Sequence, residues 1–370
     1  MQIKEVIIRE LVMKLKHPFT TSVGTETEKA FLLAEVRTEK GVSGWGEGVS
    51  ITEPIYNEET VSTNWAVLRE QLLPTLFHTT VHHPDDAARA FQYVRRNYNA
   101  KALLDGAIWD AYAKEAEKPL YEVLGGEKRP VDVGISIGIK PSMTDVLDTI
   151  TKAVDEGYKR IKVKVKPGWD IDLLKLIRAR FPDIALMADA NCAYTLADID
   201  HLKRFDDFKL MMIEQPLAED DIIDHAGLQR ELRTPICLDE SLHSDEDVRK
   251  ALELDSCRIV NMKIGRVGGL SEARRIHTRC KQEGVPLWCG GMLEAGIGRA
   301  HNLALTTLPG FTLPGDTAPS SHYWEQDIIQ PEVEMAEGQI LLPQQPGIGF
   351  EPDMDRIHAL TVRSQTFENR

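Results

Sequence analysis

After residue 130 the chain alternates short apolar runs with helical segments, and this alternation constrains the fold more than any other feature of the sequence. Alternating strands and helices predict a parallel sheet. Eight such units in fewer than 200 residues predict a closed (β/α) barrel, with a doubly wound open sheet as the alternative. The apolar runs are 131–137, 160–166, 184–189, 208–214, 235–239, 257–263, 286–290 and, less clearly, 311–315.

The first 125 residues have a different pattern and predict a small α+β domain. Their β-branched runs indicate antiparallel strands, and helices follow, the last of them at about 100–116. Two segments rich in Thr, Ser, Gly and Pro, 17–25 and 49–56, predict loops. The expected division is an α+β domain at 1–125, a barrel at 126–321, and a tail at 322–370 that packs back on the first domain.

Composition excludes several classes of protein. The net charge is −14, and no basic footprint of a nucleic-acid-binding protein is visible. The chain lacks the roughly 18 consecutive apolar residues of a membrane span, and its N-terminus lacks the features of a secretory signal. The five cysteines include no Cys-x-x-Cys pair, which disfavours a disulfide framework or a thiolate zinc site. We therefore expect a cytoplasmic protein with no nucleic-acid or membrane partner.

Charged residues stand at the ends of five successive apolar runs, separated by 24 or 25 residues. This spacing matches one strand–helix unit, so the five side chains should lie at one height at the C-terminal mouth of the barrel, where active sites of this fold form. Charges are rarely buried unless they are paired or bind a metal. The five residues are Lys164, Asp189, Glu214, Asp239 and Lys263.

The middle three residues of this set are carboxylates. Asp189, Glu214 and Asp239 would repel one another at the barrel mouth, and a divalent cation would remove that repulsion. Oxygen ligands without His or Cys favour Mg²⁺, with Mn²⁺ as a plausible substitute. The alternative for each acid is a strand-end turn or a helix cap. Glu240 is a competing ligand next to Asp239, and we expect it to support the ligands instead.

The two lysines on the second run are expected to act together. Lys162 and Lys164 lie two residues apart on one strand, so their side chains point to the same face. Neighbouring positive charge lowers the pKa of an ammonium group, which favours Lys164 as a base near neutral pH. Lys162 would then tune Lys164 or contact the substrate carboxylate. Surface charges on an alternating strand are the alternative interpretation.

Lys263 should face Lys164 across the mouth. Two lysines around a metal-bound carboxylate suit removal of the proton on the adjacent carbon, because the metal stabilises the resulting enediolate. With both lysines active the carbon can be racemised, and with one active the intermediate can expel a β-hydroxyl group. Arg266 either tunes or orients Lys263, or caps a helix.

Six segments of the barrel resemble the enolase superfamily, muconate-lactonizing subgroup, and within it the o-succinylbenzoate synthases and N-succinylamino acid (N-acylamino acid) racemases. They are "IKVKVKPGWD" (161–170), "DANCAYT" (189–195), "IEQPL" (213–217), "PICLDES" (235–241), "NMKIGRVGGL" (261–270) and "WCGGMLEAGIGRA" (288–300). The resemblance implies an N-terminal capping domain, metal ligands at Asp189, Glu214 and Asp239, and acid/base lysines at Lys164 and Lys263. It also implies substrate contacts at Ser136, Asn191, Gly291, Met292 and Glu294.

The same resemblance implies that segments 17–25 and 49–56 close over the site, with Phe19 and Met292 against the non-reacting end of a small carboxylate substrate. It implies a homo-oligomer, and either racemisation of N-succinylamino acids, dehydration in menaquinone biosynthesis, or both. A dipeptide epimerase is disfavoured, because the last strand lacks an Asp-x-Asp. A cycloisomerase of the same subgroup and a barrel that binds a metal or an acid without turnover stay as alternatives.

Overall fold

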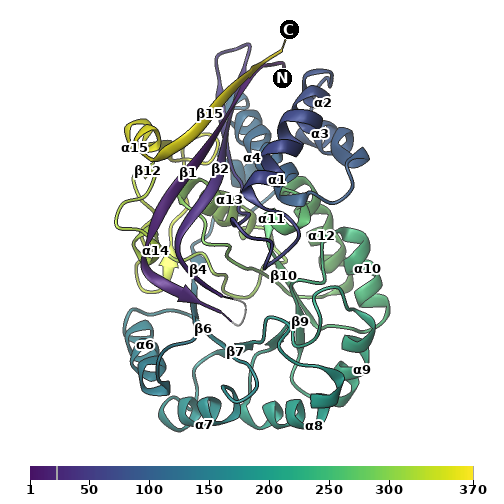
Figure 1. The fold of residues 1–370 in the computed structure, drawn as a ribbon, viewed down its shortest axis with the longest axis vertical. Coiled ribbons are helices and arrows are strands. Elements are labelled where there is room, and N and C mark those ends of the chain that lie inside the picture. Colours follow the sequence, from purple (N-terminus) through teal and green to yellow (C-terminus); the bar gives the residue numbers. More distant parts are fainter. Residues whose placement is uncertain (22–23, 370) are drawn as a thin grey trace.

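The computed structural model describes residues 1–21 and 24–369, which form an upper α+β unit above a barrel (Figure 1). The upper unit contains one antiparallel sheet in the order β15-β1-β2-β3. Its outermost strand, β15, comes from the C-terminal end of the chain and pairs with β1. The strands are β1 (Ile3–Thr20), β2 (Thr25–Thr38), β3 (Ser43–Glu47) and β15 (Thr361–Glu368).

The long helix α4 lies across this sheet and shares its apolar core with β1 and β2. Glycine in β3 permits the close packing, because a Cβ atom at Gly46 would lie 2.0 Å from the carbonyl oxygen of Leu103. The helical elements of this unit are α1 (Val61–Val67), η1 (Leu68–Leu72), α2 (Leu73–Phe77), α3 (Pro84–Ala90), η2 (Phe91–Tyr93), α4 (Tyr98–Glu115) and α5 (Leu120–Leu124).

The lower unit is a parallel sheet in the order β11-β10-β9-β8-β7-β6-β5, curled into a barrel with helices outside (Figure 1). The first seven predicted runs each contain a strand, which confirms the alternation read from the sequence. These strands and the short β4 are β4 (Val131–Asp132), β5 (Gly134–Ile137), β6 (Arg160–Lys164), β7 (Leu186–Asp189), β8 (Ile213–Glu214), β9 (Ile236–Leu238), β10 (Ile259–Met262) and β11 (Leu287–Cys289).

The eighth predicted run, 311–315, forms no regular strand. Single parallel bridges join Phe311 to Leu287 and Gly315 to Val133, so this segment closes the barrel between β11 and β5. Pro314 has no backbone N–H and cannot continue a ladder of hydrogen bonds there. The closed (β/α) barrel is confirmed, with an irregular eighth position.

The barrel helices alternate with the strands, and the tail adds short elements. The helical elements are α6 (Met143–Asp155), α7 (Ile171–Arg180), η3 (Leu196–Asp198), α8 (Ile199–Leu202), η4 (Lys203–Phe208), α9 (Ile223–Glu231), α10 (Asp245–Glu253), α11 (Ile264–Val267), α12 (Leu270–Glu283), α13 (Gly296–Leu305), α14 (Ser320–Tyr323) and α15 (Met354–Leu360). The remaining strands are β12 (Ile329–Gln330), β13 (Gln339–Ile340) and β14 (Glu351–Pro352).

One predicted loop is largely strand. Segment 17–25 was expected to be irregular, but β1 continues to Thr20 and β2 begins at Thr25, where the two residues pair across a hairpin. Threonine is β-branched and suits an extended strand, which the loop prediction underweighted. Residues 22–23 of that segment lie outside the described part. Segment 49–56 has no regular structure, as predicted.

The tail also contacts the barrel, because Gln339 of β13 pairs with Asp132 of β4. The domain boundaries at 125 and 321 therefore stay a prediction. Within residues 1–21 and 24–369, no helix combines the length and apolar character needed to cross a membrane. All five cysteines are free.

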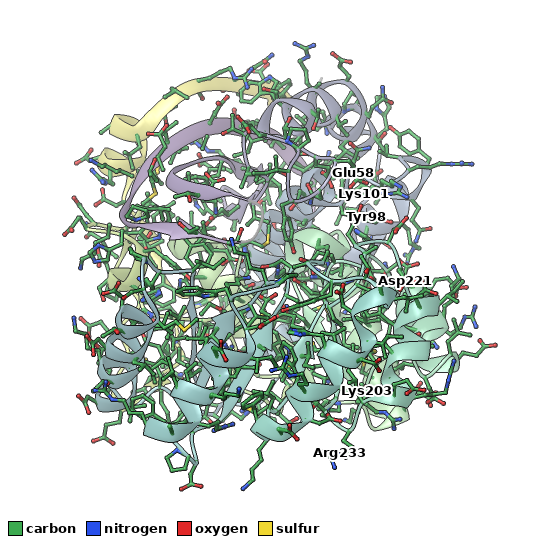
Figure 2. All side chains as sticks on the ribbon, turned by 60° about the horizontal axis from the view of Figure 1, so that its bottom comes forward. Glu58, Tyr98, Lys101, Lys203, Asp221 and Arg233 are labelled. Atoms are coloured by element: carbon green, nitrogen blue, oxygen red, sulfur yellow. The ribbon has the colours of Figure 1, made fainter. Side chains whose placement is uncertain are left out.

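The carboxyl ends of the barrel strands face the upper unit. Figure 2 shows Asp221, which follows β8, on the side nearer to Glu58 and Tyr98 of the upper unit. Lys203 and Arg233, which precede β8 and β9, lie at the far end of the barrel. The upper unit therefore covers the barrel mouth, as a capping domain would.

Candidate active site

The five charged residues come together at the ends of neighbouring strands, but only the first three share one hydrogen-bonded register, because Glu214 pairs with Cys237 and not with Asp239. Lys164 pairs in register with Asp189, and Asp189 pairs with Glu214 across the next pair of strands. Asp239 directly follows β9, and Lys263 directly follows β10. All five side chains are buried at the mouth of the barrel.

On one side of the mouth, two ammonium groups contact the carboxylates. The Nζ atom of Lys162 lies 3.1 Å from Asp189 Oδ2 and 3.0 Å from Glu214 Oε2. The Nζ atom of Lys164 donates to Asp189 Oδ2 over 2.6 Å and to Asn191 Oδ1 over 2.6 Å. The side chains of Lys162 and Lys164 therefore share a face of β6, as the spacing predicted.

On the other side, Lys263 donates to Asp239 Oδ2 over 2.6 Å and to the Oη atom of Tyr56 over 2.7 Å. Arg266, on α11, donates to the second oxygen of Asp239 and over 2.7 Å to the carbonyl of Leu242. Arg266 is buried, and the carboxylate it shares with Lys263 fixes the two cations relative to each other.

Burial and neighbouring charges shift the pKa values of Glu214 and Asp189 in opposite directions. Burial raises the pKa of Glu214, and the neighbouring Asp189 carboxylate raises it further. For Asp189 burial acts in the same direction, but the ammonium groups of Lys164 and Lys162 outweigh it and hold the pKa below its ordinary range. A cation beside Glu214 would therefore favour its ionised form, and Asn261 Nδ2 donates to its Oε1 over 2.6 Å.

The pKa of Lys162 is set by the carboxylates around it. Burial favours its neutral form, but the carboxylates of Asp316, Glu214 and Asp189 outweigh burial and raise the pKa above its ordinary range. Burial also opposes the charge of Lys263, and there Tyr56 and the nearby acids raise the pKa. The sequence argument counted the ammonium groups and underweighted the carboxylates around them.

Within the described ranges, no three His, Cys, Asp or Glu side chains are grouped to hold a metal ion as they stand. The physical reason is that ammonium and guanidinium groups contact every carboxylate of the set. Oxygens of Asp189 and Glu214 nevertheless converge on one cation, the Nζ atom of Lys162. Buried oxygen donors converging on a positive charge suit a hard divalent cation, so these residues fit a metal.

A small cavity of about 110 Å³ separates the two lysines and lies under the capping domain. Lys164 and Lys263 both line it, and the capping segments contribute Phe19, Ile51, Ile55 and Tyr56. The capping side also includes Thr21, Gly24 and Glu26, and the barrel contributes Asn191, Gly291, Met292 and Leu293. Four of the predicted substrate contacts therefore line one chamber: Phe19, Asn191, Gly291 and Met292.

The predicted contacts at Ser136, Glu240 and Glu294 do not line this chamber. The Ser136 hydroxyl donates to Asp316 Oδ2 over 2.8 Å. Glu294 accepts a hydrogen bond from the backbone N–H of Met292 over 3.0 Å, which stabilises the chamber wall from behind. Glu240 accepts a bond from Asn191 Nδ2 over 2.9 Å and lines a larger neighbouring cavity of about 640 Å³.

Sequence reasoning missed several residues of the cluster, including Asp316 and Tyr56. Asp316 pairs with Lys162 over 3.1 Å and with Arg160 over 2.8 Å. It directly follows the run 311–315, so the rule that found the other strand-end acids could have found it. Tyr56 comes from the capping domain, and no periodic pattern relates it to the barrel.

Family models match both parts of the chain. The description "Mandelate racemase / muconate lactonizing enzyme, N-terminal domain" matches residues 3–125, and "Enolase C-terminal domain-like" matches residues 145–356. Both matches agree with the fold and with the strand-end residues described above.

Individual relatives extend over nearly the whole chain. It is 56% identical to the o-succinylbenzoate synthase of Geobacillus stearothermophilus, with 99% of this chain and 97% of that protein covered. It is 47% identical to the N-succinylamino acid racemase of Thermus thermophilus, with 98% of each covered. A solved structure of an enolase-superfamily member from Listeria innocua has a TM-score of 0.97, 38% identity and full coverage of both chains. The chain therefore belongs to the enolase superfamily, in its muconate-lactonizing subgroup with the o-succinylbenzoate synthases and N-succinylamino acid racemases.

Proposed function

We propose that this enzyme removes the proton next to the carboxylate of a small acid, acting on N-succinylamino acids, on the precursor of o-succinylbenzoate, or on both. The observation that carries the proposal is that Lys164 and Lys263, from β6 and the end of β10, line a single cavity. Two groups able to exchange protons on two sides of one carbon permit either reaction.

Enzymes of this superfamily use a divalent metal, and we assign Mg²⁺, with Mn²⁺ as a substitute. Asp189, Glu214 and Asp239 would hold it, because they supply buried oxygen donors at the ends of neighbouring strands. The bound ion would withdraw electron density from the substrate carboxylate and make the adjacent proton more acidic.

Each lysine has a separate task in this proposal. Lys164, which Asp189 and Asn191 hold in place, takes or returns the proton on one face of the carbon. Lys263 does so on the other face, held by Asp239 and Tyr56. Racemisation uses both faces, whereas loss of a β-hydroxyl group needs one base and can use the other lysine as a cation.

The remaining predicted residues support these groups. We assign Phe19, Gly291 and Met292 to the non-reacting end of the substrate, because they line the chamber. Lys162 holds Asp189 and Glu214, and Arg266 holds Asp239 beside Lys263. Three further residues hold their neighbours by hydrogen bonds. Ser136 contacts Asp316, Glu240 contacts Asn191, and Glu294 contacts the backbone of Met292.

We also propose that the enzyme works in the cytoplasm as a homo-oligomer, on the basis of its free cysteines and of its family. A cycloisomerase of the same subgroup is the second candidate, since it would use the same strand-end residues. A barrel that binds an acid without turnover is less consistent with two lysines in the chamber, because ammonium groups compete with a metal for carboxylates.

The test is proton exchange. The enzyme with Mg²⁺ in D₂O is given N-succinyl-L-phenylalanine, and NMR and polarimetry follow the α-proton and the optical rotation. A racemase should exchange the α-proton and lose optical rotation. Lys164→Ala and Lys263→Ala should each abolish the loss of rotation. Rapid dehydration of the cyclohexadiene precursor of o-succinylbenzoate without exchange identifies a dedicated synthase. Failure of both reactions contradicts this substrate class, and a metal-stripped sample controls for background exchange.

A further inference from the structure

A buried ion pair of the capping domain lies against the barrel, away from the lysines and carboxylates of the proposed active site. The Nζ atom of Lys29, on β2, is 3.3 Å from Oε1 of Glu47, at the end of β3, and the two side chains are 1% and 0% exposed. Burying two charges is costly unless further hydrogen bonds satisfy them. Their other partners are therefore informative.

Those partners belong to the segment 290–298 of the barrel. Lys29 Nζ donates to the carbonyl oxygen of Leu293 over 2.7 Å. Glu47 accepts from the backbone N–H of Ala295 over 2.8 Å and from that of Gly298 over 2.7 Å. The pair thus holds both the chamber wall, which includes Leu293, and the start of α13.

The backbone at Leu293 has a strained conformation that neighbouring contacts must stabilise. Leu293 has a φ angle of 55°, in the left-handed region that residues with a side chain seldom adopt. Its carbonyl group is the one that Lys29 contacts. The close approach of Glu47 depends on glycine, because a Cβ atom at Gly298 would lie 3.0 Å from Glu47 Oε2.

The pair also lies next in sequence to the two capping segments, 17–25 and 49–56. Lys29 lies on β2, which leaves the hairpin that contains Phe19, and Glu47 precedes the segment 49–56 that contains Tyr56. Phe19 and Tyr56 form the capping side of the chamber, and Met292 and Leu293 form its barrel side. One ion pair therefore connects the two walls between which the non-reacting end of a substrate would lie.

We propose that Lys29 and Glu47 are positioning residues that set the distance between these two walls and so select the side chain of the substrate. The choice of substrates to test this inference rests on the proposed function. The residues touch neither reacting atoms nor the candidate metal ligands. Their loss should therefore weaken binding of large side chains more than it slows the chemical step.

The test uses Lys29→Met and Glu47→Gln, with Lys29→Arg as the conservative variant that keeps the charge. Burial raises the pKa of Glu47 to about 7, so assays are run near pH 8 to keep it ionised. KM and kcat are measured for N-succinyl-phenylalanine and N-succinyl-alanine. We expect KM for the phenylalanine substrate to rise about tenfold, with smaller changes in kcat and in KM for alanine, and Lys29→Arg to restore much of the loss.

Asp327→Asn is the matched control. Asp327 accepts from the N–H of Gly296 over 2.8 Å at the same helix end, but it belongs to the C-terminal part of the chain and contacts neither Lys29 nor Glu47. If the pair only caps α13, Asp327→Asn will change the KM ratio of the two substrates as Glu47→Gln does. That result, or an equal rise in KM for both substrates, would overturn the inference.

Hydrogen exchange followed by mass spectrometry gives a second readout that needs no substrate. The amides of Ala295 and Gly298 should exchange about tenfold faster in Glu47→Gln, because each loses a charged acceptor. Unchanged exchange in 290–298 overturns the inference even if the wild-type enzyme turns over neither substrate. Faster exchange with an inactive wild type supports the positioning role and refutes only the proposed function. If Lys29→Met does not fold, the near-isosteric Glu47→Gln still decides.

Discussion

The Nζ atom of Lys263 donates to the Oη atom of Tyr56 over 2.7 Å, so the capping domain supplies a direct contact to one of the two lysines in the chamber. The ammonium group also lies 4.8 Å from the centroid of the Tyr56 ring. No comparable capping contact to Lys164 is found among residues 1–21 and 24–369, where its hydrogen bonds go to Asp189 and Asn191 of the barrel. The two lysines therefore depend on different parts of the chain.

Tyr56→Phe should impair one face of the reaction. The variant keeps the ring but removes the hydroxyl that orients Lys263, and a hydrogen bond to a charged group is worth about 1.5–3 kcal/mol. We expect α-proton exchange from one enantiomer to fall at least about tenfold, and exchange from the other to change little. Enantiomer-resolved exchange in D₂O measures this. Equal losses from both enantiomers would contradict a role specific to Lys263.

Glu240→Gln should impair the opposite face. Asn191 donates its amide N–H to Glu240 and presents its amide oxygen to Lys164, so the carboxylate fixes which way the amide points. A glutamine can donate as well as accept, which permits the reversed arrangement. We expect about a tenfold loss of exchange from the enantiomer that Tyr56→Phe spares. If both variants lose exchange from the same enantiomer, Tyr56 and Glu240 do not act on different lysines.

Asp316→Asn should destabilise the barrel. The carboxylate of Asp316 pairs with the buried cations of Arg160 and Lys162. Its loss leaves the guanidinium of Arg160 without its carboxylate partner, whereas Lys162 keeps Asp189 and Glu214. Breaking a buried pair costs about 3–5 kcal/mol of unfolding free energy, measurable by urea denaturation. Ser136→Ala, which removes only a hydroxyl donor to the same carboxylate, should cost about 1 kcal/mol. Similar losses in the two variants would mean that the ion pairs add nothing.

His301 should make stability depend on pH. Burial lowers the pKa of this side chain to about 4, whereas an unfolded histidine titrates near 6.5. Below about pH 6.5 the unfolded chain binds a proton that the folded chain does not, so stability falls as the pH falls toward 4. Between about pH 7 and pH 5 this contributes a loss of about 2 kcal/mol.

Urea unfolding of His301→Gln at these two pH values should show a change smaller by that amount than the wild-type protein shows. The exposed His78→Gln is the control and should keep the wild-type change. A pH dependence identical in His301→Gln and the wild-type protein would show that His301 titrates normally in the folded state.

The barrel and five of its charged residues could be predicted, because both follow from a repeat that is visible in one dimension. Each unit adds about 25 residues, and Asp189, Glu214 and Asp239 recur with it. Tyr56, Lys29 and Glu47 could not be found this way. Their positions depend on how the capping domain docks, and docking is decided by shape and burial that no local spacing records.

The direction of the Lys162 pKa shift was also beyond the sequence, for a different reason. The neighbouring Lys164 was visible two residues away, but Asp316 lies 154 residues further along the chain. Electrostatic balance depends on every charge within a few ångströms, so an argument from one strand alone cannot give the sign of the shift.

The pairing of β15 with β1 affects the order in which the capping sheet can form during synthesis. During translation β1, β2 and β3 leave the ribosome first, but the strand that completes their sheet is made about 310 residues later, after the whole barrel. The outer edge of β1 then stays open while the barrel forms. The edge of β1 is therefore the part of the capping sheet that is paired last.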